Sequence, residues 1–176
     1  MKDKLLQQTK REYSPNQRLR ALTVEGVFFL GVFPFALIAL GSSLDQWLQW
    51  APIVYQPINL VLGGLLSVAS WLLGAWSVNV QFTLGRGTPV PLMATQKLIV
   101  QPPYTYCRNP MALGAIGMYL GVAILFGSIG AAVLVLLGAA VLLTYIKCVE
   151  EKEMELRFGQ EYLEYKERTP FLIPHL

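Results

Sequence analysis

The stretch MALGAIGMYLGVAILFGSIGAAVLVLLGAAVLLTYI, residues 111–146, decides the fold of this 176-residue chain. It contains no Asp, Glu, Lys or Arg, and Gly127-Ser128 divides it into the apolar segments 111–126 and 129–146. A helix that crosses a bilayer needs about 20 predominantly apolar residues. We therefore predict two membrane-spanning helices joined by a tight turn, which together form a helical hairpin.

Two further apolar stretches precede the hairpin. Residues 21–41 are interrupted only by Glu25 and Pro34, and residues 53–84 carry no charge. Small residues recur in the second stretch at spacings of three and four, which permits close helix packing in lipid; they are Gly63, Ser67, Ser70 and Gly74. We predict an all-α, polytopic membrane helical bundle with four transmembrane helices. A fifth span arises only if residues 53–84 bend into two pieces.

Composition and charge agree with a membrane protein. Apolar residues make up 54% of the chain and charged residues 14%, against about 25% charged in a soluble domain. The net charge of +3 is too small and too scattered for nucleic-acid binding. All 14 Lys and Arg fall in residues 1–20, 85–110 and 147–176. Because cytoplasmic segments carry such an excess, we predict one domain, residues 1–176, with these three segments and both termini in the cytoplasm.

The flanking segments complete this interpretation. The basic arm 1–20 lacks an apolar core with a cleavage-type ending, so we expect no cleaved signal peptide. Residues 147–176 are charged and predicted to form a cytosolic amphipathic helix. Cys107 and Cys148 are interpreted as reduced, cytosol-facing thiols, more as small buried filler than as nucleophiles. His175 is the only histidine, and we predict no metal site.

The start of the third span is a candidate anion site. Residues 85–110 hold five of the 11 prolines and are predicted to be loop. Asn109-Pro110 marks the helix start, since Asn is favoured at the N-cap and Pro at the first helical position. The unpaired backbone N–H groups there, with Arg108 beside them, suit a carboxylate or phosphate. The alternative is a helix start with no further role.

The exit of the fourth span is a candidate site for a cation. Four carboxylates lie in residues 150–155, where acidic side chains oppose the helix dipole; the alternative is a solvated face. The tight hairpin predicts that Glu150 or Glu151 lies near Arg108 and Asn109. Opposite charges at one site suit a zwitterionic amino-acid end, such as that of S-adenosylmethionine.

These segments resemble a known family. One set of matching residues is Tyr104, Arg108, Asn109, Pro110 and Gly114, and the other is Glu150-Glu151, FGQEYLEY at 158–165, Arg168 and Pro170. In this order, across residues 85–170, they resemble the integral-membrane isoprenylcysteine carboxyl methyltransferases and their phospholipid methyltransferase relatives. The segment 85–91 is similar to a loop of bacterial members, which favours a prokaryotic inner membrane.

The resemblance implies methyl transfer from S-adenosylmethionine, held on the cytosolic side, to a lipophilic acceptor that enters from the membrane lipids. It implies Arg108 and Glu150 as catalytic residues. The cofactor contacts it implies are Gln96, Lys97, Leu98, Ile99, Tyr104, Asn109, Pro110, Met111, Ala112, Glu150 and Glu151.

Three positions depart from the family pattern. A common histidine is Asn109 here, and a usual tyrosine is Ala112. The arginine that holds an acceptor carboxylate is Ile146, and Lys147 offers only a point charge with a different aim. An isoprenylcysteine-like carboxylate is the first acceptor hypothesis, with a phospholipid amine and a small thiol as alternatives. A non-catalytic membrane scaffold is a further alternative, and a transporter is ranked last because the spans are nearly free of polar groups.

Three other features have two interpretations each. Glu25 lies about one turn inside the first span, where an ionisable group is expensive and indicates function. We favour the alternative, in which Glu25 extends to the cytosolic interface. Tyr162 and Tyr165 are predicted to pack the tail against the loop, and Gly117-x-x-x-Gly121 to pack helices within the monomer rather than in a dimer.

Overall fold

The computed structural model describes residues 14–85 and 97–174. Every regular element in these two ranges is a helix, which confirms the all-α class. In chain order they are α2 (Pro15–Val27), the π-helix η1 (Phe28–Val32), α3 (Phe33–Leu48), α4 (Ile58–Thr83), α5 (Pro110–Leu125), α6 (Ile129–Tyr145), the π-helix η2 (Ile146–Glu150), α7 (Glu151–Phe158) and α8 (Gln160–Arg168).

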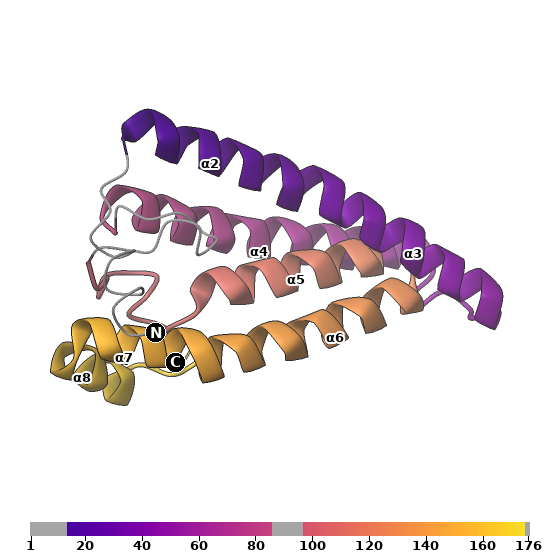
Figure 1. The fold of residues 1–176 in the computed structure, drawn as a ribbon. Helices are drawn as coiled ribbons and strands as arrows, with labels where there is room; N and C mark the ends of the chain where they lie inside the picture. The colour runs from indigo at the N-terminus through magenta and orange to yellow at the C-terminus, as the bar shows by residue number, and fades with distance from the viewer. Residues whose placement is uncertain (1–13, 86–96, 175–176) are drawn as a thin grey trace.

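The helices form an elongated bundle with two different ends (Figure 1). The turns α3–α4 and α5–α6 lie at one end. The start of α2, the described loop 97–109 before α5, and the short helices α7 and α8 lie at the other. The basic residues of these described segments therefore lie toward one end of the bundle, which we call the basic end.

Three helices are long and apolar enough to cross a membrane, namely Asn16–Leu48, Ile58–Thr83 and Ile129–Phe158. The fourth apolar helix, α5, has 16 residues. Helix α4 is continuous over its 26 residues, so the bend that a fifth span requires does not occur there. The predicted hairpin of α5 and α6 is confirmed, with its turn at Gly127-Ser128.

The first helix is longer than the predicted 21–41, at both ends. It begins with a capping box, in which the Gln17 backbone N–H donates to Ser14 Oγ at 3.3 Å and the Ser14 N–H donates to Gln17 Oε1 at 3.0 Å. The sequence signal is Ser-x-x-Gln with Pro15 at the first helical position. The helix ends at Gln49, whose φ of 55° is left-handed. The apolar pattern marks only the part that faces lipid, so it misses both ends.

The π-helix η1 lies just before Pro34, the proline in the first apolar stretch. Proline has no N–H to donate, and its ring clashes with the carbonyl one turn earlier. A locally widened helix relieves that clash but leaves carbonyls without their usual partners. The Tyr119 hydroxyl of α5 donates to the carbonyl of Phe29 at 2.8 Å. This bond ties the bulge to the bundle core.

Helices α4 and α5 approach through small residues, as predicted. A Cβ placed on Gly114 lies 2.7 Å from the Gly74 backbone N and 2.8 Å from the Ser70 carbonyl oxygen. A Cβ on Gly121 lies 2.6 Å from the Ser67 backbone N. Such distances exclude any larger side chain, so the two backbones are in direct contact. The expected role of Gly121 in packing within the monomer is confirmed.

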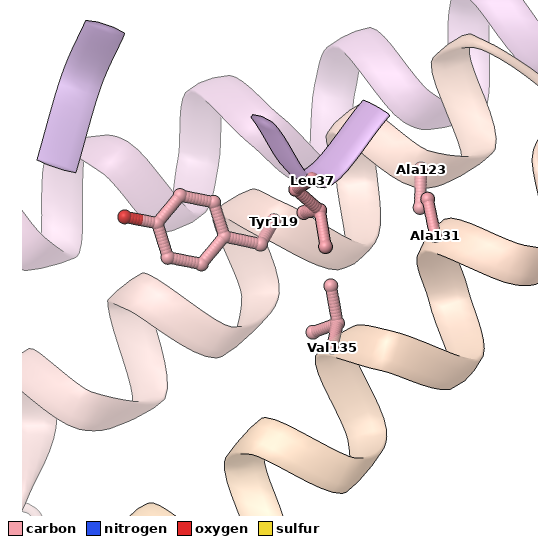
Figure 2. Packing of buried hydrophobic residues seen from close by; sticks show 5 residues of the cluster. All are labelled: Leu37, Tyr119, Ala123, Ala131 and Val135. Atoms are coloured by element: carbon pink, nitrogen blue, oxygen red, sulfur yellow. The ribbon is translucent and has the colours of Figure 1, made fainter. Parts of the chain in front are cut away.

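A small apolar core joins α3, α5 and α6 (Figure 2). Leu37 and Val135 point toward each other with Tyr119 beside them, and Ala123 and Ala131 face each other where α5 and α6 come close. The alanines are fully buried and keep the hairpin narrow. The core thus lies between the first helix and the hairpin.

Asp45 closes the end of the bundle away from the basic end. Its carboxylate accepts a hydrogen bond from Ser128 Oγ at 2.5 Å and one from the Gly130 backbone N–H at 2.7 Å. Ser128 Oγ in turn accepts from the Ala131 N–H at 2.9 Å. A carboxylate at a helix N-terminus is favoured by the helix dipole. Asp45 therefore fixes α3 to the start of α6, a contact that the sequence analysis did not anticipate.

Candidate functional site

A cavity of about 830 Å³ lies toward the basic end of the bundle. Its walls come from α2, η1 and α4 on one side, and from α5, α6, η2, α7 and α8 on the other, with residues 97–99 of the preceding loop. Much of the wall is aliphatic and aromatic, while polar and charged groups come from α7, from the loop before α5 and from α4. This composition suits a ligand with one polar end and one apolar part.

Most of the predicted site residues line this cavity: Lys97, Leu98, Ile99, Tyr104, Arg108, Asn109, Met111, Ala112, Ile146, Glu150 and Glu151. Gln96 lies outside the described residues. Pro110 is fully buried at the start of α5 but does not line the cavity. Lys147 is exposed and also lies off the cavity wall. Adjacent residues of a helix point in different directions, so Ile146 faces inward and Lys147 outward, which argues against a substrate contact by Lys147.

Arg108 and Glu151 form a buried ion pair, which confirms that the two ends of the hairpin meet. Arg108 Nη1 lies 2.9 Å from Glu151 Oε1, and the two side chains are 11% and 5% exposed. Lys166 of α8 approaches the other oxygen, Oε2, at 2.8 Å and contacts Glu155 at 2.8 Å. Glu151 therefore faces two cations and is a structural anchor of the tail.

The C-terminal tail docks on the loop just before α5. The Arg108 backbone N–H donates to the Pro170 carbonyl at 2.8 Å, and Asn109 Nδ2 donates to the Phe171 carbonyl at 2.8 Å. The Tyr165 hydroxyl donates to the Tyr104 carbonyl at 2.6 Å. The predicted packing of Tyr165 against the loop is confirmed. The sequence correctly placed Asn109 at the N-cap, but its side chain binds the tail and does not cap α5.

Tyrosines form the polar part of the wall between α4 and the tail. The Tyr104 hydroxyl lies 3.1 Å from Gln81 Oε1 and 3.3 Å from the Ser77 carbonyl oxygen. Burial raises the pKa of Tyr104 well above its usual range, and burial together with the nearby Glu151 carboxylate raises the pKa of Tyr162 to about 12. Both phenols are therefore neutral hydrogen-bonding groups at physiological pH.

The paired glutamates have different surroundings. Glu151 is held by Arg108 and Lys166, whereas Glu150 forms no ion pair with any residue in the described ranges and lines the cavity. Arg108 is likewise engaged with Glu151 and lies 5.7 Å from the centre of the Phe171 ring. The predicted anion hook at Arg108 is therefore already neutralised. Of the pair, Glu150 is therefore the cavity-lining carboxylate that forms no ion pair within the described ranges.

The phospholipid methyltransferase family model matches residues 58–161, which is more than half of the chain. The chain belongs to the phospholipid methyltransferase family. This confirms the resemblance and identifies the chain as a membrane methyltransferase. No curated protein and no solved structure matches it significantly.

In this phospholipid methyltransferase family member the first motif and the paired glutamates lie inside the matched segment, while the rest of the second motif, up to Pro170, extends beyond it. Residues 58–161 contain α4, the tyrosine-rich loop, the hairpin and α7, and hence Arg108, Asn109 and the paired glutamates. The first long helix lies outside that segment. It nevertheless contributes a full face to the cavity: Leu22, Glu25, Gly26, Phe29 and Leu30.

Glu25 and Cys148 correct two of the interpretations made from the sequence. Glu25 is 5% exposed and lines the cavity, so it does not extend to the interface. Residues 22, 25, 26 and 29 share one helix face, but the sequence alone does not show that this face lines a cavity. Cys148 is exposed, unlike Cys107, which is 1% exposed. Within the described ranges no cluster of His, Cys, Asp or Glu has metal-binding geometry.

Proposed function

We propose that this family member transfers a methyl group from S-adenosylmethionine to the amine of a membrane phospholipid. The observation that supports this most is one cavity whose lining combines polar groups of α7 and of the loop before α5 with many apolar side chains. The polar part suits the cofactor and the apolar part suits lipid chains. The family assignment supports methyl transfer, while the donor and the acceptor are our proposals.

The residues present fit S-adenosylmethionine. The cavity volume of about 830 Å³ falls in the range of small-molecule sites, about 300–1,000 Å³. The start of α5 has no side-chain cap, since Asn109 is bound to the tail. Its backbone N–H groups at Met111 and Ala112 suit a carboxylate. Glu150 suits the ammonium or sulfonium charge. When bound, this cofactor supplies a methyl group activated by the sulfonium.

The chain then mainly binds and orients the cofactor and the acceptor, and excludes water from the site. A methyl group on a sulfonium is already activated, so the chain mainly has to align it with the acceptor and keep the site dry. An amine acceptor that arrives as an ammonium must in addition lose its proton to a base before its lone pair can attack the methyl carbon. The docked tail supports the alignment and the dry site, because Tyr165 and Asn109 hold it against the start of α5. We propose Glu150 as the cofactor-binding carboxylate and Arg108 as a positioning residue that acts through Glu151.

The walls favour an amine acceptor over a carboxylate. Ile146 occupies the position where a carboxylate-binding arginine is expected, and it is buried in the wall at 5% exposure. The two lining arginines face glutamates instead: Arg108 lies 2.9 Å from Glu151, and Arg157 lies 3.5 Å from Glu153. An acceptor carboxylate would have to compete with these partners. An amine, by contrast, meets carboxylates in the wall.

Calorimetry on the purified protein in a non-ionic detergent tests the cofactor. We expect S-adenosylmethionine to bind, and Glu150→Gln to weaken binding about tenfold or more, the value of a hydrogen bond to a charged group. Glu167→Gln is the matched control, because Glu167 is exposed and lies off the cavity. Absence of binding to the wild type would favour the scaffold hypothesis, and equal binding by Glu150→Gln would remove our site assignment.

Membranes incubated with methyl-labelled cofactor test the acceptor. We expect the label in extracted phospholipid and stable to mild base, because an N-methyl bond resists hydrolysis. A base-labile label would indicate a methyl ester and restore the carboxylate hypothesis. A stable label in a small thiol would indicate S-methylation.

A further inference from the structure

The first helix meets the cavity along one stripe of residues. Their spacings of three and four place them on one face; they are Leu22, Glu25, Gly26, Phe29 and Leu30. Phe29 and Leu30 line the cavity and are also 38% and 56% exposed, so the cavity opens beside them. This opening lies within the apolar span Asn16–Leu48. A mostly apolar wall that opens toward membrane lipid suits the chains of an acceptor lipid.

The two halves of the first helix are held very differently. Helix α3 is in direct contact with the hairpin, since a Cβ on Gly41 lies 2.4 Å from the Ala131 backbone N, and Asp45 binds the start of α6. Helix α2 packs along no bundle helix in the described ranges. Its start is joined to α4 where Arg18 donates to the Phe82 carbonyl. The position of the stripe therefore depends on the junction η1 between the two halves.

A hydrogen bond from α5 completes this junction. In η1 a backbone N–H donates to the carbonyl five residues earlier, as Phe33 does to Phe28. Continued by one residue, this pattern would pair residue 34 with the Phe29 carbonyl, but Pro34 has no N–H. The Tyr119 hydroxyl donates to that same carbonyl at 2.8 Å. Tyr119 thus supplies the hydrogen bond that Pro34 cannot.

Tyr119 is itself fixed in the bundle. It is 8% exposed and belongs to the apolar core of α3, α5 and α6. Its ring centre lies 4.9 Å from that of Phe33, and it also lines the cavity. Because a buried hydroxyl needs a hydrogen-bond partner, the contact with the Phe29 carbonyl holds η1 at one distance from α5.

We propose that Tyr119 is a positioning residue for the acceptor lipid: through the Phe29 carbonyl it holds the stripe at a fixed distance from α5 and so sets the width of the acceptor side of the cavity. This inference rests on the proposed function, because it assigns the stripe to the acceptor half of the same cavity. Tyr119 lies about 14 Å along the axis from the start of α5, at 1.5 Å per residue. It therefore acts on the acceptor and not on the proposed cofactor groups.

Binding in non-ionic detergent tests the proposal without relying on turnover. The probes are a short-chain phosphatidylethanolamine and S-adenosylmethionine, each titrated by calorimetry. Tyr119→Phe removes the hydroxyl and keeps the ring. We expect it to weaken lipid binding about fivefold, the value of one net hydrogen bond, and to leave cofactor binding unchanged. Tyr55→Phe is the matched control and should change neither, because Tyr55 is exposed between α3 and α4 and lies off the cavity.

Pro34→Ala provides a rescue that a merely structural role of Tyr119 does not predict. The backbone N–H that this substitution restores can donate to the Phe29 carbonyl in place of the Tyr119 hydroxyl. In the Pro34→Ala background, Tyr119→Phe should therefore change lipid affinity by less than about twofold. An equal loss in both backgrounds would show that the hydroxyl does not act through the Phe29 carbonyl.

Other outcomes overturn the proposal in distinguishable ways. If Tyr119→Phe weakens lipid and cofactor alike, Tyr119 supports the whole cavity and not its acceptor side. If it weakens neither, the bond to Phe29 does not position the stripe. If the wild type fails to bind S-adenosylmethionine but its lipid binding still depends on Tyr119 and is rescued by Pro34→Ala, the proposed function fails and the positioning role stands.

A second pair of variants tests the stripe itself if a thermal unfolding scan shows that Tyr119→Phe does not fold. Leu30→Trp narrows the opening from an exposed lining position, so it should weaken lipid binding and spare the cofactor. Val32→Trp is its control, because Val32 is also exposed but does not line the cavity. Unchanged lipid binding in Leu30→Trp, or an equal effect in Val32→Trp, would contradict the assignment of the stripe to the acceptor.

Discussion

Neutralising Glu151 should release the tail from the loop, and the structure allows the size of the effect to be worked out. Removing one partner of a buried ion pair costs about 3–5 kcal/mol, because the other charge stays buried. Glu151→Gln leaves Arg108, which is 11% exposed, without its carboxylate. Arg108→Gln is milder, since Glu151 keeps its contact with Lys166 at 2.8 Å. We expect Glu151→Gln to lower the free energy that holds the tail on the loop by about 3 kcal/mol. Arg108→Gln should lower it by about 1–2 kcal/mol, because Lys166 still pairs with Glu151 but is partly exposed, so its screened charge compensates only part of the loss.

Cys107 provides the assay. It is 1% exposed, and the residues on both sides of it bind the docked tail through the Tyr104 and Arg108 backbones. Burial also raises the pKa of its thiol, which slows reaction with a maleimide. Cys148, the only other cysteine, is exposed and is replaced by serine. The labelling rate of Cys107 then reports the fraction of molecules with an open tail.

A free-energy change of 1.36 kcal/mol changes an equilibrium constant tenfold, and the expected labelling rates follow from this relation. Glu151→Gln should raise the labelling rate about 150-fold, and Arg108→Gln about 5- to 30-fold. The free-energy change in the double variant should be smaller than the sum of the changes in the two single variants, because in the double variant neither charge remains buried without a partner. Equal rates in the two single variants would show that Lys166 does not support Glu151. An unchanged rate in both would show that the ion pair does not hold the tail.

Three further predictions concern packing, capping and pH. Gly114→Leu should lower the free energy of unfolding in detergent by about 3 kcal/mol or more, because the new side chain meets the α4 backbone. Gly138→Ala is the control, because a Cβ there meets no atom within 4 Å; it should raise the free energy of unfolding by about 1 kcal/mol or less. Asp45→Ala should cost about 1–3 kcal/mol without changing the affinity for S-adenosylmethionine measured by calorimetry, since the Asp45 contacts lie at the opposite end of the bundle. Burial raises the pKa of Cys107 above 9.0 and that of Tyr165 above 10.0, and hydrogen bonds to glutamates raise that of Lys166 above 10.5. Each group stabilises the fold fully below its ordinary pKa and loses that effect as the pH rises through the raised one, so the unfolding temperature should stay level up to about pH 8 and fall progressively above about pH 9.

The sequence predicted the features that depend on periodicity and on chain connectivity. The small residues of α4 recur at the helical repeat, which predicted close packing in lipid; the structure shows that the partner is α5, at Gly114. The turn at Gly127 is too short to allow any arrangement but antiparallel helices. One of the paired glutamates was therefore expected near Arg108, and the structure shows that it is Glu151.

The sequence did not predict which partner each polar side chain binds. Asn109 has the residue type of an N-cap, but the Phe171 carbonyl of the distant tail competes for its amide. Asp45 has no local signal, because its partners lie more than 80 residues away at the start of α6. Glu25 was misjudged because a single helix does not reveal which of its faces meets the bundle and which meets lipid.

The proposed cofactor side and the proposed acceptor side of the cavity come from different parts of the chain. Asn109 and Glu150 lie within residues 58–161, whereas Glu25 and its stripe lie on the preceding helix. A substitution on that helix changes what the lipid contacts without moving the cofactor groups, since α2 is not part of the hairpin that positions them. Acceptor preference is therefore expected to follow the cavity-lining residues of that helix more closely than either motif. A relative with the same Asn-Pro and Glu-Glu pairs but different lining residues there should bind the cofactor equally well and methylate a different class of lipid.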